Sequence, residues 1–134
     1  MTAVTRPLID VCGVRKQFRS RSGAVLEALS DTSLAVQAKQ FLCIVGPSGC
    51  GKSTLLRMIA GLETVSGGTI TIDGVPILGP RRDIGLVFQS PVLLPWRTIL
   101  KNVLVPAEVL RLDSASAQKR AQDLLKLVGL DTRR

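Results

Sequence analysis

The 134-residue sequence predicts an α/β fold built around a glycine-rich loop between a strand and a helix. Three observations lead to this prediction. A continuous apolar run at 41–45 is followed by glycines at 46, 49 and 51, and then by apolar residues at helical spacing. β-Branched residues dominate 69–72, which favours a strand. Apolar residues in the last third of the chain recur at helical spacing.

The N-terminal part predicts an antiparallel β segment. Residues 8–14 alternate between apolar and polar side chains, and 25–29 and 33–36 are two further short strand candidates. The run at 41–45 has the sequence Phe-Leu-Cys-Ile-Val. Such a run is typical of a strand that is buried on both faces of a parallel sheet.

The segment after the loop predicts a helix, a hairpin and a further strand. Apolar residues follow the loop at helical spacing, namely Leu55, Met58, Ile59 and Leu62. Gly61 suits the left-handed conformation that ends many helices. The Asp-Gly pair at 73–74 predicts a tight turn between strands at 69–72 and 75–77. Residues 84–88 form another short apolar strand candidate.

From Pro91 onward the chain predicts helices. Pro91, Pro95 and Pro106 punctuate this region, and Thr98 can cap a short helix through Leu104. A second helix is predicted by apolar residues that fall on one helical face, namely Ala121, Leu124, Leu125 and Val128. We expect Gly129 to end that helix, with the polar residues 131–134 closing the sequence.

Composition excludes several classes of protein. A hydrophobic content of 46% with 21% charged residues is typical of a globular domain. No apolar run approaches the ~20 residues of a membrane span, and the N-terminus has no secretion signal, so a cytoplasmic protein is expected. Zero histidines exclude histidine-containing zinc sites and serine–histidine or cysteine–histidine nucleophiles. Three cysteines without a CxxC pair predict a reducing compartment, with Cys12 and Cys43 as small hydrophobes inside apolar strands.

The net charge of +8 raises the question of a polyanionic partner. The eighteen basic residues are spread along the chain, and three Phe, one Trp and no Tyr leave no aromatic cluster on which bases could stack. We therefore expect no nucleic acid partner, and a solvated or membrane-facing basic surface instead.

The glycine-rich loop matches the Walker A pattern G-x-x-x-x-G-K-[ST], through Gly46, Gly51, Lys52 and Ser53. The glycines allow successive backbone N–H groups to surround a phosphate, and the start of the helix adds donors and a partial positive charge. Lys52 can place its ammonium on the β- and γ-phosphates, and the hydroxyl of Ser53 can ligate Mg²⁺. The loop therefore predicts a nucleoside triphosphate site.

The residues around this loop resemble the ATP-binding subunits of ABC transporters. The resemblance rests on 41–56, Ile-Ala-Gly-Leu at 59–62, Ser-Gly-Gly at 66–68, 69–74, and Val-Phe-Gln at 87–89, where the family has its Q-loop. It implies a P-loop NTPase core of the ABC ATPase type that binds ATP and Mg²⁺. It implies nucleotide binding by Phe18, as an adenine platform, and by Gly46, Pro47, Ser48, Gly49, Cys50, Gly51, Lys52, Ser53 and Thr54. Lys52 and Gln89 would be catalytic, and Ser53 and Gln89 would ligate Mg²⁺.

The run Leu-Leu-Pro-Trp at 93–96 resembles one branch of this family, the importers of nitrate, aliphatic sulfonates and taurine. In the family this region receives a coupling helix of the permease. The resemblance therefore implies a permease partner, a second ATPase subunit arranged head to tail and, indirectly, a periplasmic or extracellular solute-binding protein. It implies a peripheral position on the inner face of the cell membrane. Because the permease and binding protein select the solute, this chain does not predict it.

The resemblance covers about half of a complete ATPase domain. Residues 1–89 resemble a partial ABC ATPase core and 90–134 the start of a helical subdomain, without the LSGGQ signature, Walker B or the switch histidine. We expect no significant ATP turnover by this chain alone, and marginal stability from open sheet edges around Phe41, Ile44, Ile84 and Val87. A non-hydrolytic nucleotide-binding remnant or regulatory fragment is the alternative. A small P-loop kinase or GTPase is a third, although no Asn-Lys-x-Asp guanine motif is visible.

Overall fold

The computed structural model describes residues 6–130. Residues 1–5, half of the N-terminal stretch 1–10 that has no secretion signal pattern, and the polar residues 131–134 lie outside this range. The chain divides into two compact units, Met1–Leu86 and Val87–Arg134. Whether 1–89 and 90–134 correspond to a partial ATPase core and a helical subdomain stays a prediction.

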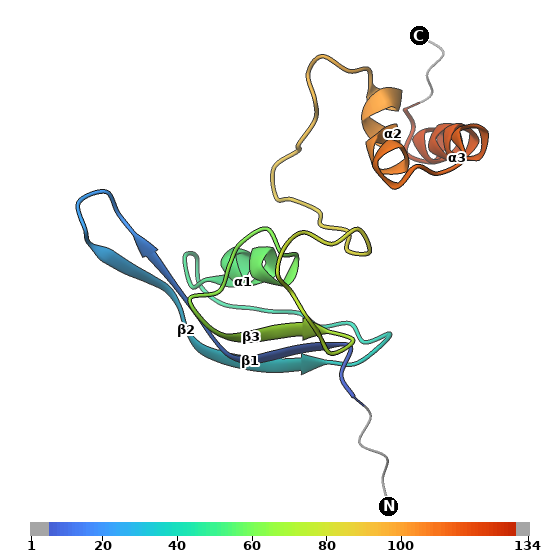
Figure 1. Cartoon of the computed structure of the whole chain (residues 1–134). Helices are drawn as coiled ribbons and strands as arrows, with labels where there is room; N and C mark the ends of the chain where they lie inside the picture. Colours follow the sequence, from blue (N-terminus) through green and yellow to red (C-terminus); the bar gives the residue numbers. More distant parts are fainter. Residues whose placement is uncertain (1–5, 131–134) are drawn as a thin grey trace, which may run out of the picture. The chain divides into compact units, whose positions relative to one another are not determined.

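The first unit contains a four-stranded antiparallel sheet (Figure 1). Its strands are β1 (Ile9–Arg19), β2 (Val25–Val36), β3 (Gly67–Ile72) and β4 (Val75–Pro76), in the spatial order β2-β1-β3-β4. The predicted antiparallel segment is therefore confirmed. The two strand candidates at 25–29 and 33–36 form one continuous strand, because β1 pairs with β2 along its whole length from Ile9 opposite Val36 to Arg19 opposite Val25.

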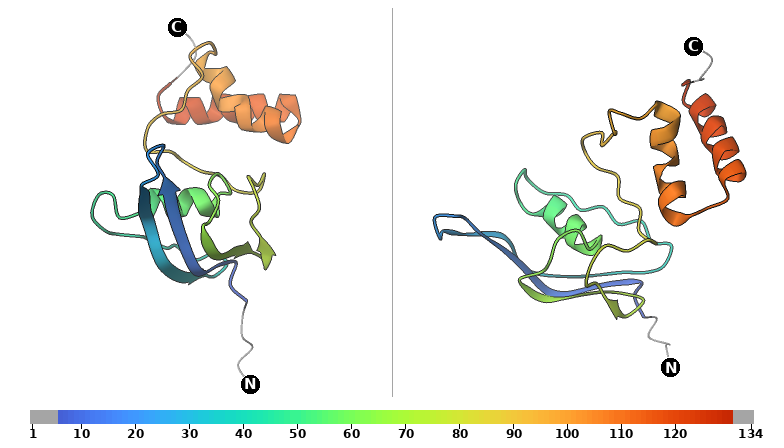
Figure 2. Two further views of the ribbon diagram at one scale, coloured as in Figure 1. Left: turned by 60° about the vertical axis from the view of Figure 1, so that its left-hand side comes forward. Right: turned by 45° about the horizontal axis from the view of Figure 1, so that its top comes forward.

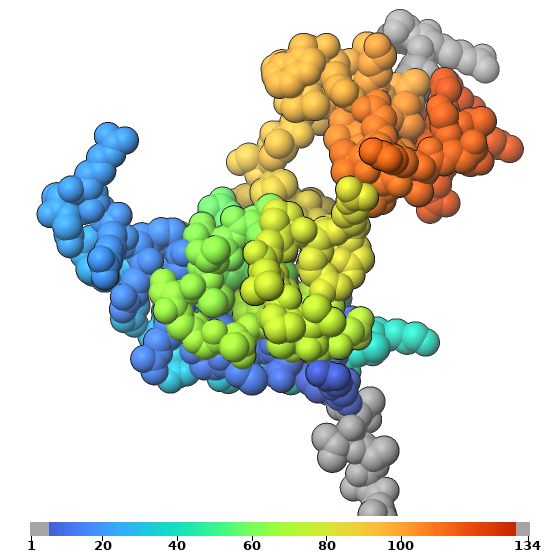
Figure 3. Space-filling model, viewed as in Figure 1, coloured from blue at the N-terminus to red at the C-terminus, as the bar shows by residue number. Residues whose placement is uncertain are grey.

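The β1–β2 hairpin is longer than the rest of the sheet, and its tip around residues 19–25 projects from the unit (Figure 3). All side chains from Gln17 to Glu27 are exposed. Strand β3 pairs with the other edge of β1, where Ile9 faces Ile72 and Val11 faces Ile70. The Asp-Gly turn at 73–74 joins β3 to the two-residue β4, as predicted.

One helix, α1 (Lys52–Ile59), covers one face of this sheet (Figure 2). The core between helix and sheet consists of Val11, Val14, Leu55, Met58 and Ile70. Val11 and Val14 are both buried although they are three positions apart, because the pairing with β2 shifts between them. Such a bulge returns the next apolar residue to the core face. Gly61 has φ of +71° just past the helix, which confirms its predicted role.

Two predicted strands are wrong. Residues 41–45 and 84–88 have no strand conformation, and within the described chain each strand pairing involves β1, β2, β3 or β4. Phe41 is 92% exposed and Val87 is 95% exposed, so these runs are not buried. A strand forms only beside a neighbour that pairs with its N–H and C=O groups. Cys12 lies in β1 as expected, but its side chain is exposed and not packed as a small hydrophobe, and Cys43 is exposed and outside any described strand.

The second unit contains two helices, α2 (Ile99–Leu110) and α3 (Ser114–Leu127). Thr98 caps α2 as predicted, since its hydroxyl accepts from the N–H of Lys101 at 3.3 Å. The helix continues six residues beyond the predicted end at Leu104 and contains Pro106, which does not interrupt it.

On α3, Ala121 and Leu125 are buried, whereas Leu124 and the capping residue Val128 are exposed. Only two of the four residues of the predicted apolar face are therefore packed in the interior. Gly129 follows α3 with φ of +75°, as expected for the residue after a helix end. Among residues 6–130, no helix is both long and apolar enough to cross a bilayer.

Candidate functional site

The start of α1 places several backbone donors at the glycine-rich loop. The first hydrogen bond of the helix runs from the N–H of Leu55 to the carbonyl of Gly51, at 2.8 Å. The N–H groups of Lys52, Ser53 and Thr54 precede that bond, and such groups have no acceptor within a helix. Gly51 offers no side-chain cap, and the described first turn of α1 carries no acidic residue. The helix N-terminus is therefore suited to an anion.

The ammonium of Lys52 lies against the loop that precedes it. Its Nζ donates to the carbonyl of Gly46 at 2.8 Å and to the carbonyl of Pro47 at 2.6 Å. The thiol of Cys50 lies 3.4 Å from the same Nζ. The loop and the helix start thus bring one positive charge together with the backbone donors. Ser48, Gly49 and Ser53 are exposed, and Thr54 is half-buried.

Gly51 fixes the loop against strand β2. Its φ is +91°, and a Cβ at this position would lie 2.5 Å from the carbonyl oxygen of Ala28 and 2.9 Å from Cδ1 of Leu29. Only glycine tolerates both the backbone conformation and this close approach. Gly49 also has a positive φ, of +81°, but a Cβ there would meet nothing within 4 Å. Sequence reasoning missed the role of Ala28, because a contact with a strand more than twenty residues away leaves no local signal.

Phe18 lies near the same stretch of the hairpin. It is opposite Leu26 of β2, two residues from the Ala28 that contacts Gly51. Two residues of a strand span about 7 Å. The structure thus brings the predicted adenine platform and the predicted phosphate loop to one part of the β1–β2 hairpin. Phe18 itself is 39% exposed.

Lys16 and Glu63 are site neighbours that sequence reasoning did not identify. Lys16 is 6% exposed, its Nζ donates to Oε1 of Glu63 at 2.6 Å and to the carbonyl of Thr64 at 2.7 Å, and it lies 4.9 Å from the ring centre of Phe18. The hydrogen bond from Lys16 is the main reason that the pKa of Glu63 is lowered. Alternation along β1 places residues 14, 16 and 18 on one face, and this was the signal available in the sequence.

Gln89 lies in the second unit, whereas the glycine-rich loop lies in the first. Its side chain is exposed, and the segment 84–88 before it has no regular secondary structure instead of the predicted strand. In the described part of the chain, no group of three or more cysteine, aspartate or glutamate side chains could hold a metal ion. The predicted Mg²⁺ ligands, Ser53 and Gln89, are thus a hydroxyl and an amide in different units.

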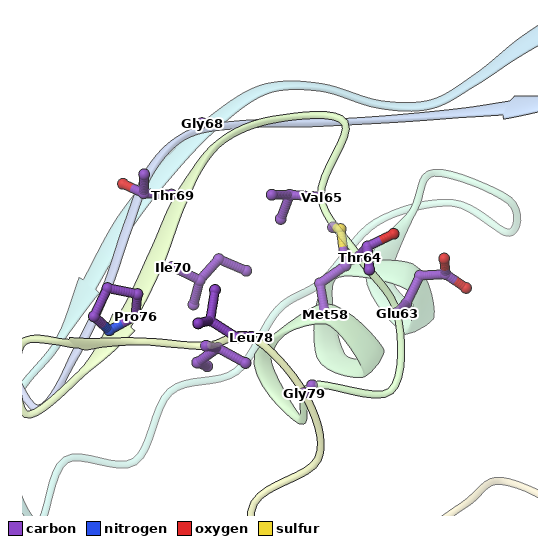
Figure 4. Close-up of a pocket in the computed structure, with 12 residues that line it drawn as sticks. Met58, Glu63, Thr64, Val65, Gly68, Thr69, Ile70, Pro76, Leu78 and Gly79 are labelled. Carbon is purple, nitrogen blue, oxygen red and sulfur yellow. The ribbon is translucent and has the colours of Figure 1, made fainter.

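A cavity of about 250 Å³ lies elsewhere in the first unit, between the end of α1 and strands β3 and β4 (Figure 4). Its walls are mainly apolar and include Met58, Val65, Ile70 and Leu78, whose side chains point toward one another. None of the predicted site residues lines it. Glu63 and Thr64 also line it, but the carboxylate of Glu63 and the carbonyl of Thr64 already accept hydrogen bonds from Lys16, so we interpret this cavity as a packing gap of the core.

The geometry of the loop fits a polyphosphate. Three backbone N–H groups, a helix N-terminus and the ammonium of Lys52 gather at one place, and a neighbouring exposed phenyl ring can stack on a base. The comparisons with known proteins agree with this interpretation. Residues 29–134 match the family model described as ABC transporter.

Two curated relatives show the extent of the similarity. The taurine import ATP-binding protein of Pseudomonas putida is 44% identical over 109 residues, which cover 81% of this chain and 42% of the relative. The aliphatic sulfonates import ATP-binding protein of Burkholderia cenocepacia is 45% identical over 100 residues, covering 75% and 35%. This chain therefore spans less than half the length of the curated relatives it matches.

A solved structure shows the same architecture. It is described as a dimeric, post-hydrolysis state of an ATP-binding cassette bound to ADP and Pi, and it superposes with a TM-score of 0.80 at 30% identity. The superposition covers 93% of this chain and 59% of that chain. The expected P-loop NTPase architecture of the ABC ATPase type is thereby confirmed.

Proposed function

The chain belongs to the ABC transporter family, and from this premise we propose that it is the nucleotide-binding part of an importer's ATP-binding subunit. In this role it holds ATP while the complete subunit couples ATP binding and hydrolysis to solute uptake through a permease. One observation carries the proposal. Gly51 of the loop approaches Ala28 of β2, and Phe18 is paired with Leu26 only two residues away, so both lie at one stretch of the β1–β2 hairpin. A nucleotide requires both a phosphate cradle and a base platform.

We assign the nucleotide's parts to the described groups by their chemistry. The N–H groups at the start of α1 and the ammonium of Lys52 hold the β- and γ-phosphates. The N–H groups donate hydrogen bonds to phosphate oxygens, and the ammonium adds a full positive charge. The phenyl ring of Phe18 stacks on adenine. Ser53 and Gln89 are the residues that would hold Mg²⁺, which neutralises phosphate charge when bound.

The segment before α2 is the proposed contact with the permease. Trp96 is 77% exposed there, and an exposed indole is a frequent anchor of protein interfaces. Asn102 holds this segment in place, since its Oδ1 accepts from the N–H of Leu94 at 2.8 Å and its Nδ2 donates to the carbonyl of Arg97 at 3.2 Å. The permease contact places the subunit on the inner face of the cell membrane.

The remaining partners follow from the same proposal. A second ATP-binding subunit completes a head-to-tail dimer, which is supported by the dimeric state of the solved cassette. A solute-binding protein acts on the other side of the permease. The names of the curated relatives support taurine or an aliphatic sulfonate as the solute class. Nitrate, the third solute of the resembled branch, remains a candidate, because the permease and not this chain selects the solute.

Binding of ATP to wild-type chain and to Lys52→Ala tests the nucleotide site. We expect the dissociation constant, measured by isothermal titration calorimetry with Mg²⁺ present, to rise at least about tenfold, since a charged donor to the phosphates is lost. Arg57→Ala is the matched control, because it removes an exposed positive charge from the same helix without touching the loop. Equal affinities of the two variants would argue against the proposed site.

A further inference from the structure

Among residues 6–130, Lys16 is the only charged residue whose side chain is buried. Burying an ammonium is unfavourable unless its hydrogen bonds are satisfied. Two acceptors satisfy it, the carboxylate of Glu63 at 2.6 Å and the carbonyl of Thr64 at 2.7 Å. Both belong to the loop that follows α1, so Lys16 joins strand β1 to the far end of the helix whose start forms the phosphate loop.

The same ammonium lies over the ring of Phe18, at 4.9 Å from the ring centre. A cation at this distance is attracted to the face of an aromatic ring. The ammonium itself cannot move freely, because Glu63 and Thr64 anchor it. One face of the ring is therefore occupied by a fixed charge, and the phenyl group remains partly exposed.

We propose that Lys16 is a positioning residue for base recognition, which holds the ring of Phe18 in one orientation so that its opposite face receives adenine. This inference rests on the proposed function, since it requires Phe18 to stack on the base. A ring held in place before binding loses less side-chain entropy when the base arrives. The cation also withdraws electron density from the ring, which favours stacking with the electron-rich adenine.

The contribution of the base to the binding affinity can be measured apart from that of the phosphates. Inorganic tripolyphosphate presents phosphates alone, so it reports the loop at Lys52 without the contribution of Phe18. The ratio of the affinity for ATP to that for tripolyphosphate measures base recognition. A residue that merely supports the fold would change both affinities together, whereas a residue that positions Phe18 changes the ratio.

The test compares Lys16→Met with Phe18→Ala in the complete chain, by titration calorimetry with each probe. Met keeps the length of the lysine stem and removes the charge. We expect Lys16→Met to weaken ATP binding about three- to tenfold and to leave tripolyphosphate binding unchanged. Arg15→Met is the matched control, because Arg15 is the neighbouring cation of β1 and its pair with Asp31 is exposed to solvent. It should change neither affinity.

Glu63→Ala gives an independent readout, because it leaves the lysine charged and removes its anchor. ATP binding should weaken in the same direction as in Lys16→Met, with tripolyphosphate unaffected. The inference is overturned if Phe18→Ala lowers the ratio while Lys16→Met does not, or if Lys16→Met weakens both probes equally. An unchanged ratio in Phe18→Ala would instead reject the base platform of the proposed function, and the inference with it.

Discussion

At the scale of single residues, Gly51 combines a left-handed backbone with a close approach to the carbonyl of Ala28. Gly51→Ala should lower the free energy of unfolding by about 2 kcal/mol or more, because strain from positive φ adds to a steric clash. Urea unfolding followed by circular dichroism measures this loss.

Gly49→Ala is the control for that substitution. Its φ is also positive, but the added methyl group would have open space. Only the backbone strain remains, so the loss should be about 1 kcal/mol. Equal losses in the two variants would show that the contact with Ala28 does not constrain the loop.

Also at the residue scale, the pair of Lys16 and Glu63 makes stability depend on pH. The hydrogen bond from Lys16 lowers the pKa of Glu63 in the folded state. Its stabilisation is therefore fully present above the ordinary carboxyl pKa of about 4.3 and is lost as the pH falls through the lowered folded value. The difference in unfolding free energy between wild type and Glu63→Gln should therefore be constant above about pH 5 and shrink as the pH falls below it. A difference that stays constant with pH would contradict this assignment.

At the scale of secondary-structure elements, Asn102 of α2 ties down the segment that carries Trp96. Its side chain bonds Leu94 through both its oxygen and its nitrogen and also reaches the carbonyls of Arg97 and Thr98. Asn102→Ala should cost about 2 kcal/mol in unfolding free energy, since several partners lose hydrogen bonds together. Hydrogen exchange should show the N–H of Leu94 losing protection.

Asp123→Ala is the matched control for this substitution, because Asp123 is an exposed residue of α3. It should change the unfolding free energy by no more than about 0.5 kcal/mol. If Leu94 kept its protection in Asn102→Ala, the turn before α2 would be held by other contacts. The ion pair between Arg97 and Glu108, at 2.7 Å, is the next candidate for that role.

At the scale of the whole molecule, large apolar side chains lie in solvent. Phe41 and Val87 are both more than nine-tenths exposed, which favours self-association. Replacing both by serine should reduce light scattering of the purified chain and shift the melting temperature by less than about 3 °C, because neither side chain contributes to the core. Val14→Ser, at a fully buried position, should instead cost about 2–4 kcal/mol. A large loss of stability in the double variant would show that these side chains are packed.

Much of the fold and site could be predicted from local patterns. The cap at Thr98, the turn at 73–74 and the ends of helices at Gly61 and Gly129 depend on the backbone preferences of single residues. The glycine-rich loop and its helix were likewise visible in the sequence. The two strands at 41–45 and 84–88 could not be judged in this way, because an apolar run shows the preference for a strand and not the presence of its partner.

The sequence by itself therefore determined the glycine-rich loop, the antiparallel hairpins and the two C-terminal helices, since each follows from residues close together in the chain. Only the tertiary structure decided how the loop meets the rest of the site. It placed Gly51 against Ala28, brought Phe18 to the same stretch of the hairpin and joined Lys16 to Glu63. Gly51 and Ala28, like Lys16 and Glu63, are far apart in the chain, and the packing of α1 on the sheet brings each pair together.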